Sequence, residues 1–305
     1  MMIDYKKIIR NKSLRIALLK ALKWVPDTTM LKFQYYLKFG FFPNLKTPKR
    51  YSEKMQLYKL RYRNPILSQC VDKYDVRAYI TSKGLGEYLV PLYGVYDKIE
   101  DVIFEDLPDK FVVKNTTGGG GMNVIVVNDK SKCDWIDICK QVNKWHVHHK
   151  GESTIGREWA YNNMPETRIL VEKLLEPTDN FGLIDYKFIC FNGRTDYLYV
   201  MSDRAFGKDA ALAIYDRDFH KTNVYEIGER RADYILPVPK NFQKMVEIAD
   251  KLSEDIPQVR VDLYNVDGKI YFGELTFYDE SGYTRFDPDS FDFELGKLFD
   301  IESFA

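Results

Sequence analysis

Residues 259–264 read Val-Arg-Val-Asp-Leu-Tyr, and residues 270–276 read Ile-Tyr-Phe-Gly-Glu-Leu-Thr. Both stretches alternate apolar residues with other types, which is the period of a half-buried β-strand. Arg260 and Asp262 share one face of the first strand, and Glu274 lies on the polar face of the second. A guanidinium and two carboxylates on adjacent strands suit a divalent metal with phosphate oxygens beside it. The two strands therefore predict such a site, provided that both polar faces are the same face of the sheet.

The turn between the two strands decides whether those faces coincide. A two-residue loop at 267–268 would turn Glu274 away from Asp262, whereas a three-residue loop at 266–268 places both carboxylates on one side. Three-residue hairpin loops favour a type I turn closed by a left-handed residue, usually glycine, and Gly268 stands at that position. We therefore predict the three-residue loop, and with it a carboxylate pair facing one site.

Charge is unevenly spread along the chain. The 305 residues are 45% apolar and 30% charged, which is ordinary for a globular protein with a large core, and the net charge is zero. Residues 1–50 contain 12 Lys and Arg against 2 Asp and Glu, or +10, so the remainder contains 33 against 43, or −10. A basic arm on an acidic body predicts an anionic partner, such as a lipid surface, a polyanionic glycan or nucleic acid. Packing of the arm on its own body is the alternative.

The four cysteines show neither a CxxC pair nor the spacing of a disulfide framework. No segment is long and apolar enough to span a bilayer, and the N-terminus lacks the apolar region of a signal peptide. These features predict a reduced, cytoplasmic protein.

A basic amphipathic helix is predicted over residues 13–24. Its apolar positions follow helical spacing at Leu14, Ala17, Leu18, Ala21 and Leu22. Arg15, Lys20 and Lys23 lie off that stripe. Such a helix can lie on an anionic membrane surface, or it can dock on its own domain.

The rest of the chain alternates helical and strand patterns. Further helices are predicted over residues 31–40, 52–63, 72–83, 134–145 and 241–253. Further strands are predicted over residues 111–114, 123–127, 169–175, 185–191 and 196–201.

A glycine-rich loop, Asn115-Thr116-Thr117-Gly118-Gly119-Gly120-Gly121, joins two of these strands. Four glycines let the backbone approach a ligand and offer N–H groups to an anion. No Gly-Lys-Ser/Thr follows and no helix opens here, so the loop is neither a Walker A loop nor a dinucleotide fingerprint. It predicts a flap over nucleotide phosphates, which Lys114 could reach; a flexible hairpin tip is the alternative.

Charge also stands at the end of the buried strand at 169–175. The bend after Glu172 could present backbone groups to an adenine edge, and Asp185 could accept a ribose hydroxyl; an ordinary strand end is the alternative. His146, His148 and His149 follow one another with no fourth ligand nearby, so zinc is not expected.

Taken in order, these pieces resemble the ATP-grasp superfamily, such as D-alanine–D-alanine ligase. The pieces are Val71-Asp72-Lys73, Val113-Lys114 with the glycine loop, Val171-Glu172-Lys173-Leu174-Leu175, Asp185-Tyr186-Lys187, Arg260-Val261-Asp262 and Gly273-Glu274-Leu275-Thr276. The finer texture is similar to the branch associated with teichuronopeptide synthesis and found in bacterial capsule and polysaccharide loci. It includes Ser52-Glu53-Lys54, residues 72–77, residues 107–114, residues 185–188 and Phe277-Tyr278, and the resemblance runs from about Thr47 to the C-terminus.

The resemblance implies ATP and Mg²⁺ as cofactors and a role for each matching residue. The implied phosphate contacts are Lys73 and Lys114, with Lys187 and Arg204 as further candidates, beneath a flap of Gly118, Gly119, Gly120 and Gly121. The implied adenine site is Glu172 with Lys173, Leu174 and Leu175, and Asp185 would bind the ribose. The implied metal ligands are Asp262, Glu274 and Thr276, the last standing where many superfamily members carry Asn. Arg260 and Lys114 would act on the transferring phosphoryl group.

The implied fold is α+β, an ATP-grasp fold in which two α+β subdomains enclose ATP. A basic helical segment, residues 1–65, replaces the usual N-terminal α/β domain. Residues 66–170 would form the subdomain with the glycine flap, and residues 171–305 the subdomain with the metal-binding hairpin. Because the α/β domain that often helps to hold substrate is missing, the resemblance does not imply which acceptor is used.

The implied activity is that of an ATP-dependent carboxylate–amine ligase acting through an acyl phosphate. Its product would be an amide on a sugar or amino-acid component of a bacterial surface polysaccharide. The protein would be cytoplasmic, with peripheral contact to the inner membrane face or an anionic glycan through the basic segment, and without nucleic acid. The alternatives are a kinase of a sugar hydroxyl, a glycosyltransferase using Asp287-Pro288-Asp289 as its metal motif, and a non-catalytic glycan- or membrane-binding protein.

Overall fold

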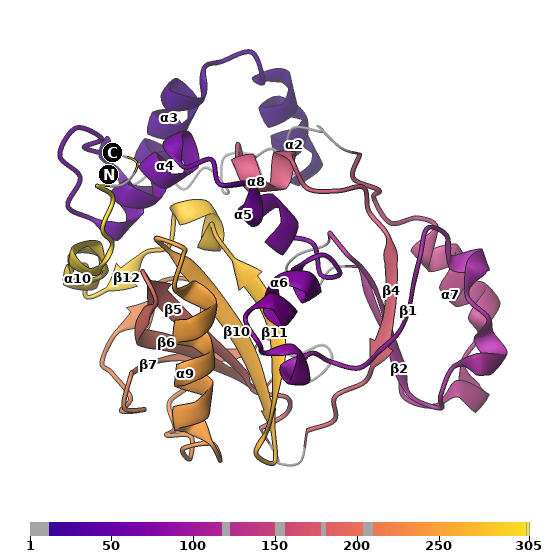
Figure 1. Ribbon diagram of the computed structural model, residues 1–305. Helices are drawn as coiled ribbons and strands as arrows, with labels where there is room; N and C mark the ends of the chain where they lie inside the picture. Colours follow the sequence, from indigo (N-terminus) through magenta and orange to yellow (C-terminus); the bar gives the residue numbers. More distant parts are fainter. Residues whose placement is uncertain are drawn as a thin grey trace.

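The computed structural model describes residues 12–117, 123–149, 156–177, 181–203, 210–302 and 304. These residues form two main β-sheets, each with helices on one face, and a helical N-terminal region above them (Figure 1). The expected α+β class is therefore confirmed. None of the described helices is both long enough and apolar enough to cross a membrane.

Helices dominate the first part of the chain, as expected. They are α2 (Lys12–Ala21), α3 (Asp27–Phe39), α4 (Tyr51–Arg61), α5 (Pro65–Cys70) and α6 (Val76–Ser82). Helix α3 ends where Gly40 takes a left-handed conformation with φ 84°. Helix α4 packs against α10 (Ser290–Leu298), and its buried side chains Tyr51, Met55 and Tyr58 join the larger of two hydrophobic cores.

The smaller sheet has four strands in the order β1-β4-β2-β3, all antiparallel to their neighbours. The strands are β1 (Leu92–Tyr96), β2 (Phe111–Asn115), β3 (Val124–Val127) and β4 (Ile169–Lys173). Phe111 and Val113 point to one face and pack with Ile138 and Val142 of α7 (Trp135–Val142). Because side chains alternate along a strand, Lys114 points to the opposite face.

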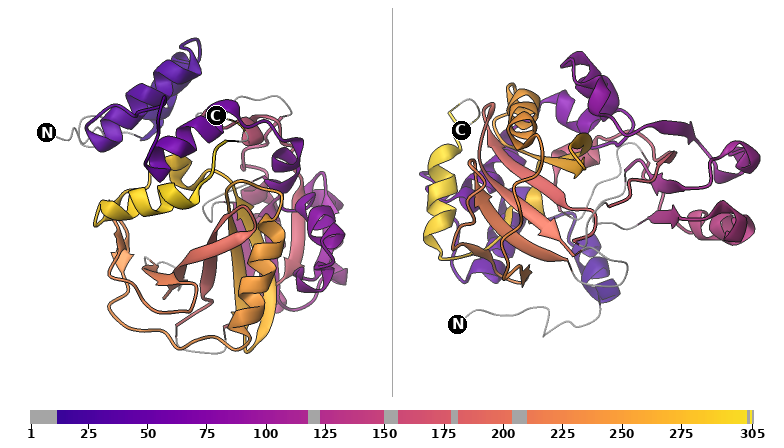
Figure 2. Two further views of the ribbon diagram at one scale, coloured as in Figure 1. Left: turned by 60° about the vertical axis from the view of Figure 1, so that its left-hand side comes forward. Right: turned by 90° about the horizontal axis from the view of Figure 1, so that it is seen from below.

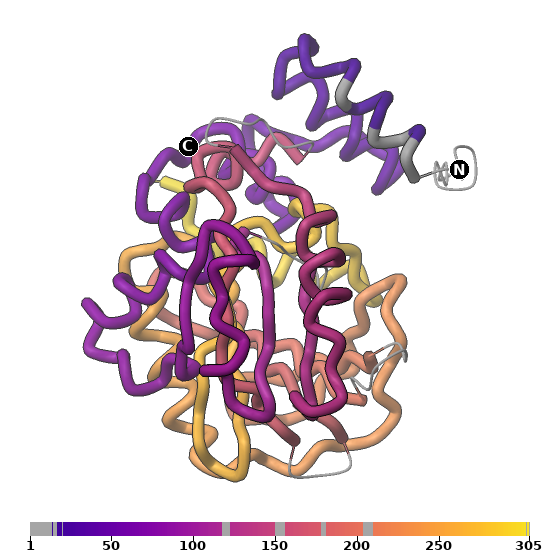
Figure 3. The backbone as a smooth tube through the Cα atoms, turned by 90° about the vertical axis from the view of Figure 1, so that its right-hand side faces the viewer, coloured from indigo at the N-terminus to yellow at the C-terminus, as the bar shows by residue number. Residues whose placement is uncertain are grey.

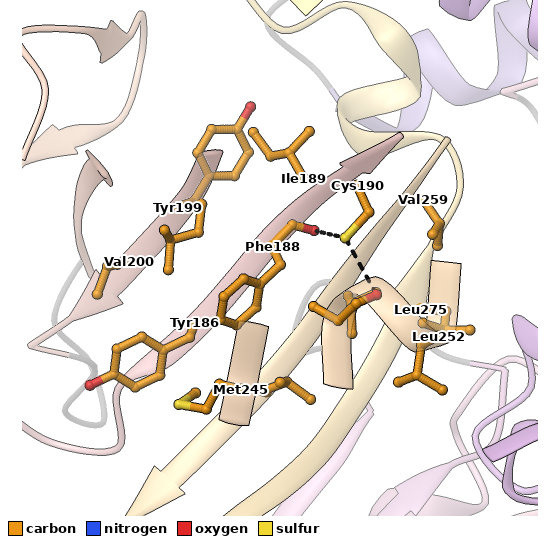
Figure 4. Packing of buried hydrophobic residues seen from close by; sticks show 14 of the residues in the cluster. Tyr186, Phe188, Ile189, Cys190, Tyr199, Val200, Met245, Leu252, Val259 and Leu275 are labelled. Carbon is orange, nitrogen blue, oxygen red and sulfur yellow. Dashed lines mark hydrogen bonds between the residues drawn. The ribbon is translucent and has the colours of Figure 1, made fainter. Parts of the chain in front are cut away.

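The larger sheet has the order β11-β10-β5-β6-β7-β9. Its strands are β5 (Asp185–Phe191), β6 (Arg194–Ser202), β7 (Ala211–Asp216), β9 (Arg230–Arg231), β10 (Val259–Val266) and β11 (Lys269–Thr276). Helix α9 (Phe242–Ser253) covers one face, where Phe188 packs with Met245 and Leu252 (Figure 4). The Cys190 thiol on the same face lies 3.8 Å from the Ala249 carbonyl oxygen of α9. The alternating apolar residues of β5 and β10 thus pack against α9, and the polar residues between them point to the opposite face of the sheet.

Short elements complete the described chain. They are α8 (Trp159–Asn162), β8 (Tyr225–Glu226), β12 (Phe286–Asp287) and the 3-10 turns η1 (Gly86–Tyr88), η2 (Ile99–Asp101), η3 (Phe104–Asp106), η4 (Lys130–Lys132) and η5 (Asp279–Gly282). Strand β8 pairs with β12, and Leu89 forms a bridge with Phe272 that joins the segment before β1 to the larger sheet. The boundaries proposed at residues 65 and 170 stay predictions.

The predicted three-residue loop of the β10–β11 hairpin is wrong. Val266 pairs with Lys269, so the loop is Asp267-Gly268, and both residues have positive φ, 50° and 90°. This is the two-residue type I′ turn that Asp-Gly favours, because its twist matches that of the strands. The preference of Asp-Gly for a two-residue type I′ turn therefore decides the loop length. The left-handed conformation of Gly268, which could also have closed a three-residue loop, serves the shorter turn.

A β-bulge restores the register that the shorter loop would have lost. The pairing shifts between Asp262 and Leu263, which are opposite Glu274 and Phe272, so Gly273 is the extra residue. A Cβ on Gly273 would lie 3.0 Å from the Asp262 carbonyl oxygen, so a larger residue would crowd the bulge. Asp262 and Glu274 are therefore directly opposite each other on one face, as expected, but for a reason that the sequence pattern did not reveal.

Candidate functional site

The face of the larger sheet away from α9 carries a network of charged side chains. Asp262 is opposite Lys187 on one side and Glu274 on the other, because β10 lies between β5 and β11. Its side chain is 1% exposed and forms an ion pair with Lys187. Lys187 also contacts Asp185 at 2.6 Å. The sequence alternation that buries Phe188 and Val261 under α9 therefore gathers these charges on the opposite face.

Arg260 is the centre of this network. Its guanidinium donates to both carboxylate oxygens of Asp262, at 2.7 and 2.8 Å, and approaches Glu274 at 3.3 Å. It also forms an ion pair with Asp279, at the start of η5. Thr276 pairs with Arg260 across the strands and so shares its face. The three predicted metal ligands thus lie together with Arg260, whereas Lys114, the other residue predicted to act on the phosphoryl group, lies on the smaller sheet.

The charges in the network stabilise one another despite burial. Burial opposes the charged form of Asp262, but the cations Arg260 and Lys187 hold the pKa of its carboxyl below the usual value. Burial likewise opposes the charge on Lys187, yet Asp262 and Asp185 raise the pKa of its ammonium. Glu274 differs, since its side chain is 39% exposed. The network therefore consists of a buried, fully paired carboxylate beside an accessible one.

The second half of the site lies on the smaller sheet. Val112 is opposite Glu172 on β4, and Lys114 is opposite Leu170, so Lys114 and Glu172 share the face away from α7. The two side chains form an ion pair. Lys73 joins them through its backbone, because its N–H donates to the Thr116 carbonyl oxygen at 2.8 Å.

The turn that carries Lys73 is fixed by Asp72. This carboxylate is fully buried, accepts from the backbone N–H groups of Tyr74 and Asp75 at 2.9 Å, and pairs with Arg168 at 3.0 Å. It holds the chain in a turn, so α6 begins at Val76 and not at residue 72 as predicted.

Lys73 connects the two halves electrostatically. Burial lowers the pKa of its ammonium, and the nearby Lys114 adds to this effect. Glu274 of the larger sheet opposes the shift, as do Asp72 and Glu172. Lys73, in the turn between α5 and α6, is therefore within electrostatic range of Lys114 and Glu172 on the smaller sheet and of Glu274 on the larger one.

The structure places the adenine and ribose candidates as follows. Glu172 and Lys173 end β4, and Leu174 and Leu175 follow it half-buried. The Lys173 N–H donates to the Pro91 carbonyl oxygen at 2.9 Å. Asp185 is 2% exposed and lies in the ion-pair network beside Lys187. Roles in binding adenine and ribose stay predictions for these residues.

Two groups of predicted residues lie outside the described part of the chain. They are the flap glycines Gly118, Gly119, Gly120 and Gly121, and the phosphate candidate Arg204. Their assigned roles also stay predictions.

Sequence reasoning missed Asp279 and the turn behind it. Glu280 and Ser281 have positive φ, 44° and 58°, a strained conformation for residues with a Cβ. Lys59 of α4, 1% exposed, donates to the Ser281 carbonyl oxygen at 3.0 Å and hydroxyl at 2.9 Å. Burial lowers the pKa of Lys59 to about 8, with Glu158 and Asp27 opposing. The polar turn directly after β11, the strand that carries Glu274 and Thr276, was the sequence signal that could have revealed Asp279.

Further carboxylates surround the network beyond Asp279. Glu226 of β8 is half-buried, and burial together with Asp279, Glu229 and Glu280 raises the pKa of its carboxyl to about 8. Nothing in the sequence around Glu226 marks it as a site residue. Asp289, from the alternative metal motif, accepts from Arg50 at 2.7 and 2.8 Å, so it is engaged where α4 meets α10.

The residues present fit Mg²⁺. Carboxylate and hydroxyl oxygens are the hard donors this ion takes, and it is commonly bound through one or two carboxylates together with substrate phosphates. Glu274 offers an accessible carboxylate, and Asp262 and Thr276 lie on the same face. Both carboxylate oxygens of Asp262 accept from Arg260 and one also from Lys187, so the exposed Glu274 is the more accessible ligand.

The chain matches the protein family described as TupA-like ATPgrasp over residues 53–300. Among solved structures it is similar to the D-alanine–D-alanine ligase of Bacillus anthracis complexed with ATP, with 16% identity, a TM-score of 0.43, and coverage of 70% of this chain and 57% of that one. It is also similar to the D-alanine–D-alanine ligase from Helicobacter pylori, with 14% identity, a TM-score of 0.40, and coverage of 76% of this chain and 60% of that one. A third similar structure is N5-carboxyaminoimidazole synthetase from Staphylococcus aureus complexed with ADP, with 13% identity, a TM-score of 0.39, and coverage of 68% of this chain and 44% of that one. No curated protein matches the chain.

This chain spans about three fifths of the length of the D-alanine–D-alanine ligases it matches. At such identities and TM-scores the likeness carries no argument about activity. The assignment of this chain therefore rests on the family match, which covers most of its length.

Proposed function

Because the chain belongs to the TupA-like ATPgrasp family, we propose that it uses ATP to join a carboxylic acid to an amine. The family match makes it an ATP-grasp protein, with the fold expected from its sequence. The observation that carries the proposal is the shared face of Arg260, Asp262, Glu274 and Thr276, on which the Glu274 carboxylate is accessible.

The proposed reaction has two steps. A carboxylate oxygen of the first substrate attacks the γ-phosphorus of ATP, the bond to the β,γ-bridging oxygen breaks, and ADP leaves with that electron pair. The nitrogen of an amine then attacks the acyl carbon, inorganic phosphate leaves, and the amine loses a proton. Both steps place negative charge on phosphate oxygens, so fixed cations are the main catalytic requirement.

Each half of the site has a proposed part in this chemistry. Lys73 and Lys114 hold the nucleotide phosphates, and Arg260 stabilises the charge on the transferring phosphoryl group. Asp262 orients Arg260 through its two hydrogen bonds. Magnesium, when bound near Glu274, supplies further charge neutralisation on the phosphates. Adenine is proposed beside Glu172 and residues 173–175, with the ribose at Asp185.

The proposed substrates are a sugar or amino-acid component of a bacterial surface polysaccharide. The support for this class is the resemblance of the sequence to the branch found in bacterial capsule and polysaccharide loci. The carboxylate of Asp279, paired with Arg260, suits an ammonium group more than a second anion at this end of the site.

Trapping of the acyl phosphate tests the proposal. The full chain with ATP, Mg²⁺ and each of a panel of amino acids and uronic acids is expected to release ADP. With hydroxylamine as the amine it should form a hydroxamate, identified by mass. A product that gains a phosphoryl group in place of losing water would identify a kinase, and stabilisation by a UDP-sugar but not by ATP would identify a glycosyltransferase.

A further inference from the structure

The apolar stripe of α2 is exposed. Leu14 is 58% exposed and Leu18 is 47% exposed, and Ala17 and Ala21 on the same side of the helix are exposed too. Trp24, shortly after the helix, is 80% exposed. A surface helix normally buries such a stripe on its own protein. The stripe of this helix is therefore available to another apolar surface.

Helix α3 continues this exposed apolar character. Its buried side is Met30, Leu31 and Tyr35, whereas Phe33 on the other side is 51% exposed. Phe42, 63% exposed, stacks on Tyr36 of α3 with ring centroids 4.7 Å apart. Aromatic rings of this kind are the side chains that enter the boundary between lipid headgroups and acyl chains.

Exposed lysines accompany these rings. Lys23 precedes Trp24, Lys32 precedes Phe33, and Lys46 and Lys49 follow Phe42, all four exposed. The first 50 residues carry +10 against −10 in the rest of the chain. A second copy would bring the same positive segment to this surface, whereas an anionic bilayer offers both an apolar interior and the opposite charge.

The two helices project from the body, to which α3 is joined by its buried side, where Tyr35 bonds to Ser52 of α4 at 2.9 Å. In Figures 2 and 3 they extend beyond the rest of the molecule. Arg157 donates to the carbonyl oxygens of Leu22 and Val25, at 2.7 and 2.5 Å, and to the Asp27 carboxylate at 2.6 Å. These bonds fix the turn between α2 and α3 from the side of the body, and they involve none of the exposed apolar side chains.

We propose that α2, Trp24 and the exposed side of α3 form a peripheral docking surface for an anionic lipid bilayer. Lysines bring the protein to the headgroups, and the stripe with Trp24 and Phe33 enters the interface, without any segment crossing the bilayer. This inference is independent of the proposed ligase activity. It would place the catalytic body at a membrane surface.

Vesicle flotation with the full chain tests this surface. The chain is expected to float with vesicles of phosphatidylcholine containing about 30% phosphatidylglycerol and not with phosphatidylcholine alone. Binding should weaken at high salt, because headgroup attraction is screened. The double variant Leu18→Ser and Trp24→Ser should reduce partitioning roughly tenfold. Lys32→Glu should weaken binding at low salt and make it less dependent on salt concentration, because one attractive charge is replaced by a repulsive one.

Matched variants control for general effects of surface change. Ile235→Ser and Val238→Ser alter exposed apolar residues elsewhere, 77% and 63% exposed, and Lys297→Glu alters an exposed lysine of α10. All three should float like the wild type, and ADP release should be equal in every variant. No flotation with anionic vesicles, undiminished flotation of the double variant, or self-association that is lost in the double variant without lipid binding would overturn the proposal.

Discussion

The two sheets contribute opposite charges and very different cores to the candidate site. The smaller sheet presents the lysines, Lys114 and the neighbouring Lys73, over a core shared only with α7 and nearby turns. The larger sheet presents the carboxylates around Arg260, over a core that also includes α4, α9 and α10. The site therefore joins a lightly supported cationic half to a heavily supported, mainly anionic half. Movement of the smaller half relative to the larger is the easier route to opening the site.

Core truncation should separate the two halves most clearly. Phe111 and Phe188 are both fully buried, one in each core, and replacement by alanine should cost about 3–5 kcal/mol in either. We expect Phe111→Ala to lower hydrogen-exchange protection in β1–β4 selectively and Phe188→Ala to lower it throughout. Equal loss in both sheets for both variants would show that the halves unfold as one unit.

Removal of the buried carboxylate charge should have the next largest effect. Asp262→Asn removes the negative charge and one of the two acceptors that orient Arg260, so ADP release should fall by about 10²–10³-fold, as when one preorganised group is lost from a transition-state site. ATP affinity should change less, because Lys73 and Lys114, the first phosphate candidates, lie outside the larger sheet. The control is Asp250→Asn, which breaks the pair that this carboxylate of α9 forms with Arg217. Calorimetry measures the binding of ATP to each variant. Full activity of Asp262→Asn would remove this residue from the mechanism.

Loss of a lysine should have the converse effect. Lys114→Met removes a charged hydrogen bond to phosphate, worth about 1.5–3 kcal/mol, so the Kd for ATP should rise roughly 10–150-fold. Lys110→Met is the control, since Lys110 is on the approach to the same strand and pairs with exposed Glu176. If Lys114→Met binds ATP as tightly as Lys110→Met does, the nucleotide phosphates lie elsewhere.

The smallest expected effect is a change in pH dependence at Glu226. Its pKa is about 8 in the folded protein against 4.5 for an ordinary glutamate, so between these values the unfolded chain binds fewer protons and stability falls as pH rises. Glu226→Gln should flatten the dependence of Tm on pH between about 5 and 8. Thermal unfolding at several pH values measures this, with Glu105→Gln in η3 as the exposed control. An unchanged profile would mean that Glu226 titrates normally.

Sequence periodicity was sufficient for the parts of the site that follow strand alternation. The shared faces of Arg260 with Asp262, and of Lys114 with Glu172, follow from period-two patterns and are seen in the structure. The facing of Asp262 and Glu274 was predicted correctly from a loop length that is wrong. A bulge depends on local backbone crowding around one glycine, and no apolar pattern encodes that.

Contacts between segments that are far apart in the sequence could not be predicted from its periodicity. Asp279 pairs with Arg260 because a strained turn, held by Lys59 from α4, brings it back to the sheet. The sequence likewise did not decide whether the apolar stripe of α2 is buried or exposed, since its pattern suits both a docked and an undocked helix. In each case the deciding partner is far away in sequence or belongs to another surface.

The bulge at Gly273 has a consequence for how this hairpin tolerates changes in length. Deleting one residue from the tip would flip the parity of β11 relative to β10, and straightening the bulge would flip it back. A one-residue deletion at the tip and a larger side chain at position 273, each disruptive alone, are therefore expected to compensate each other. Shortened relatives of this hairpin should carry a larger residue where Gly273 stands.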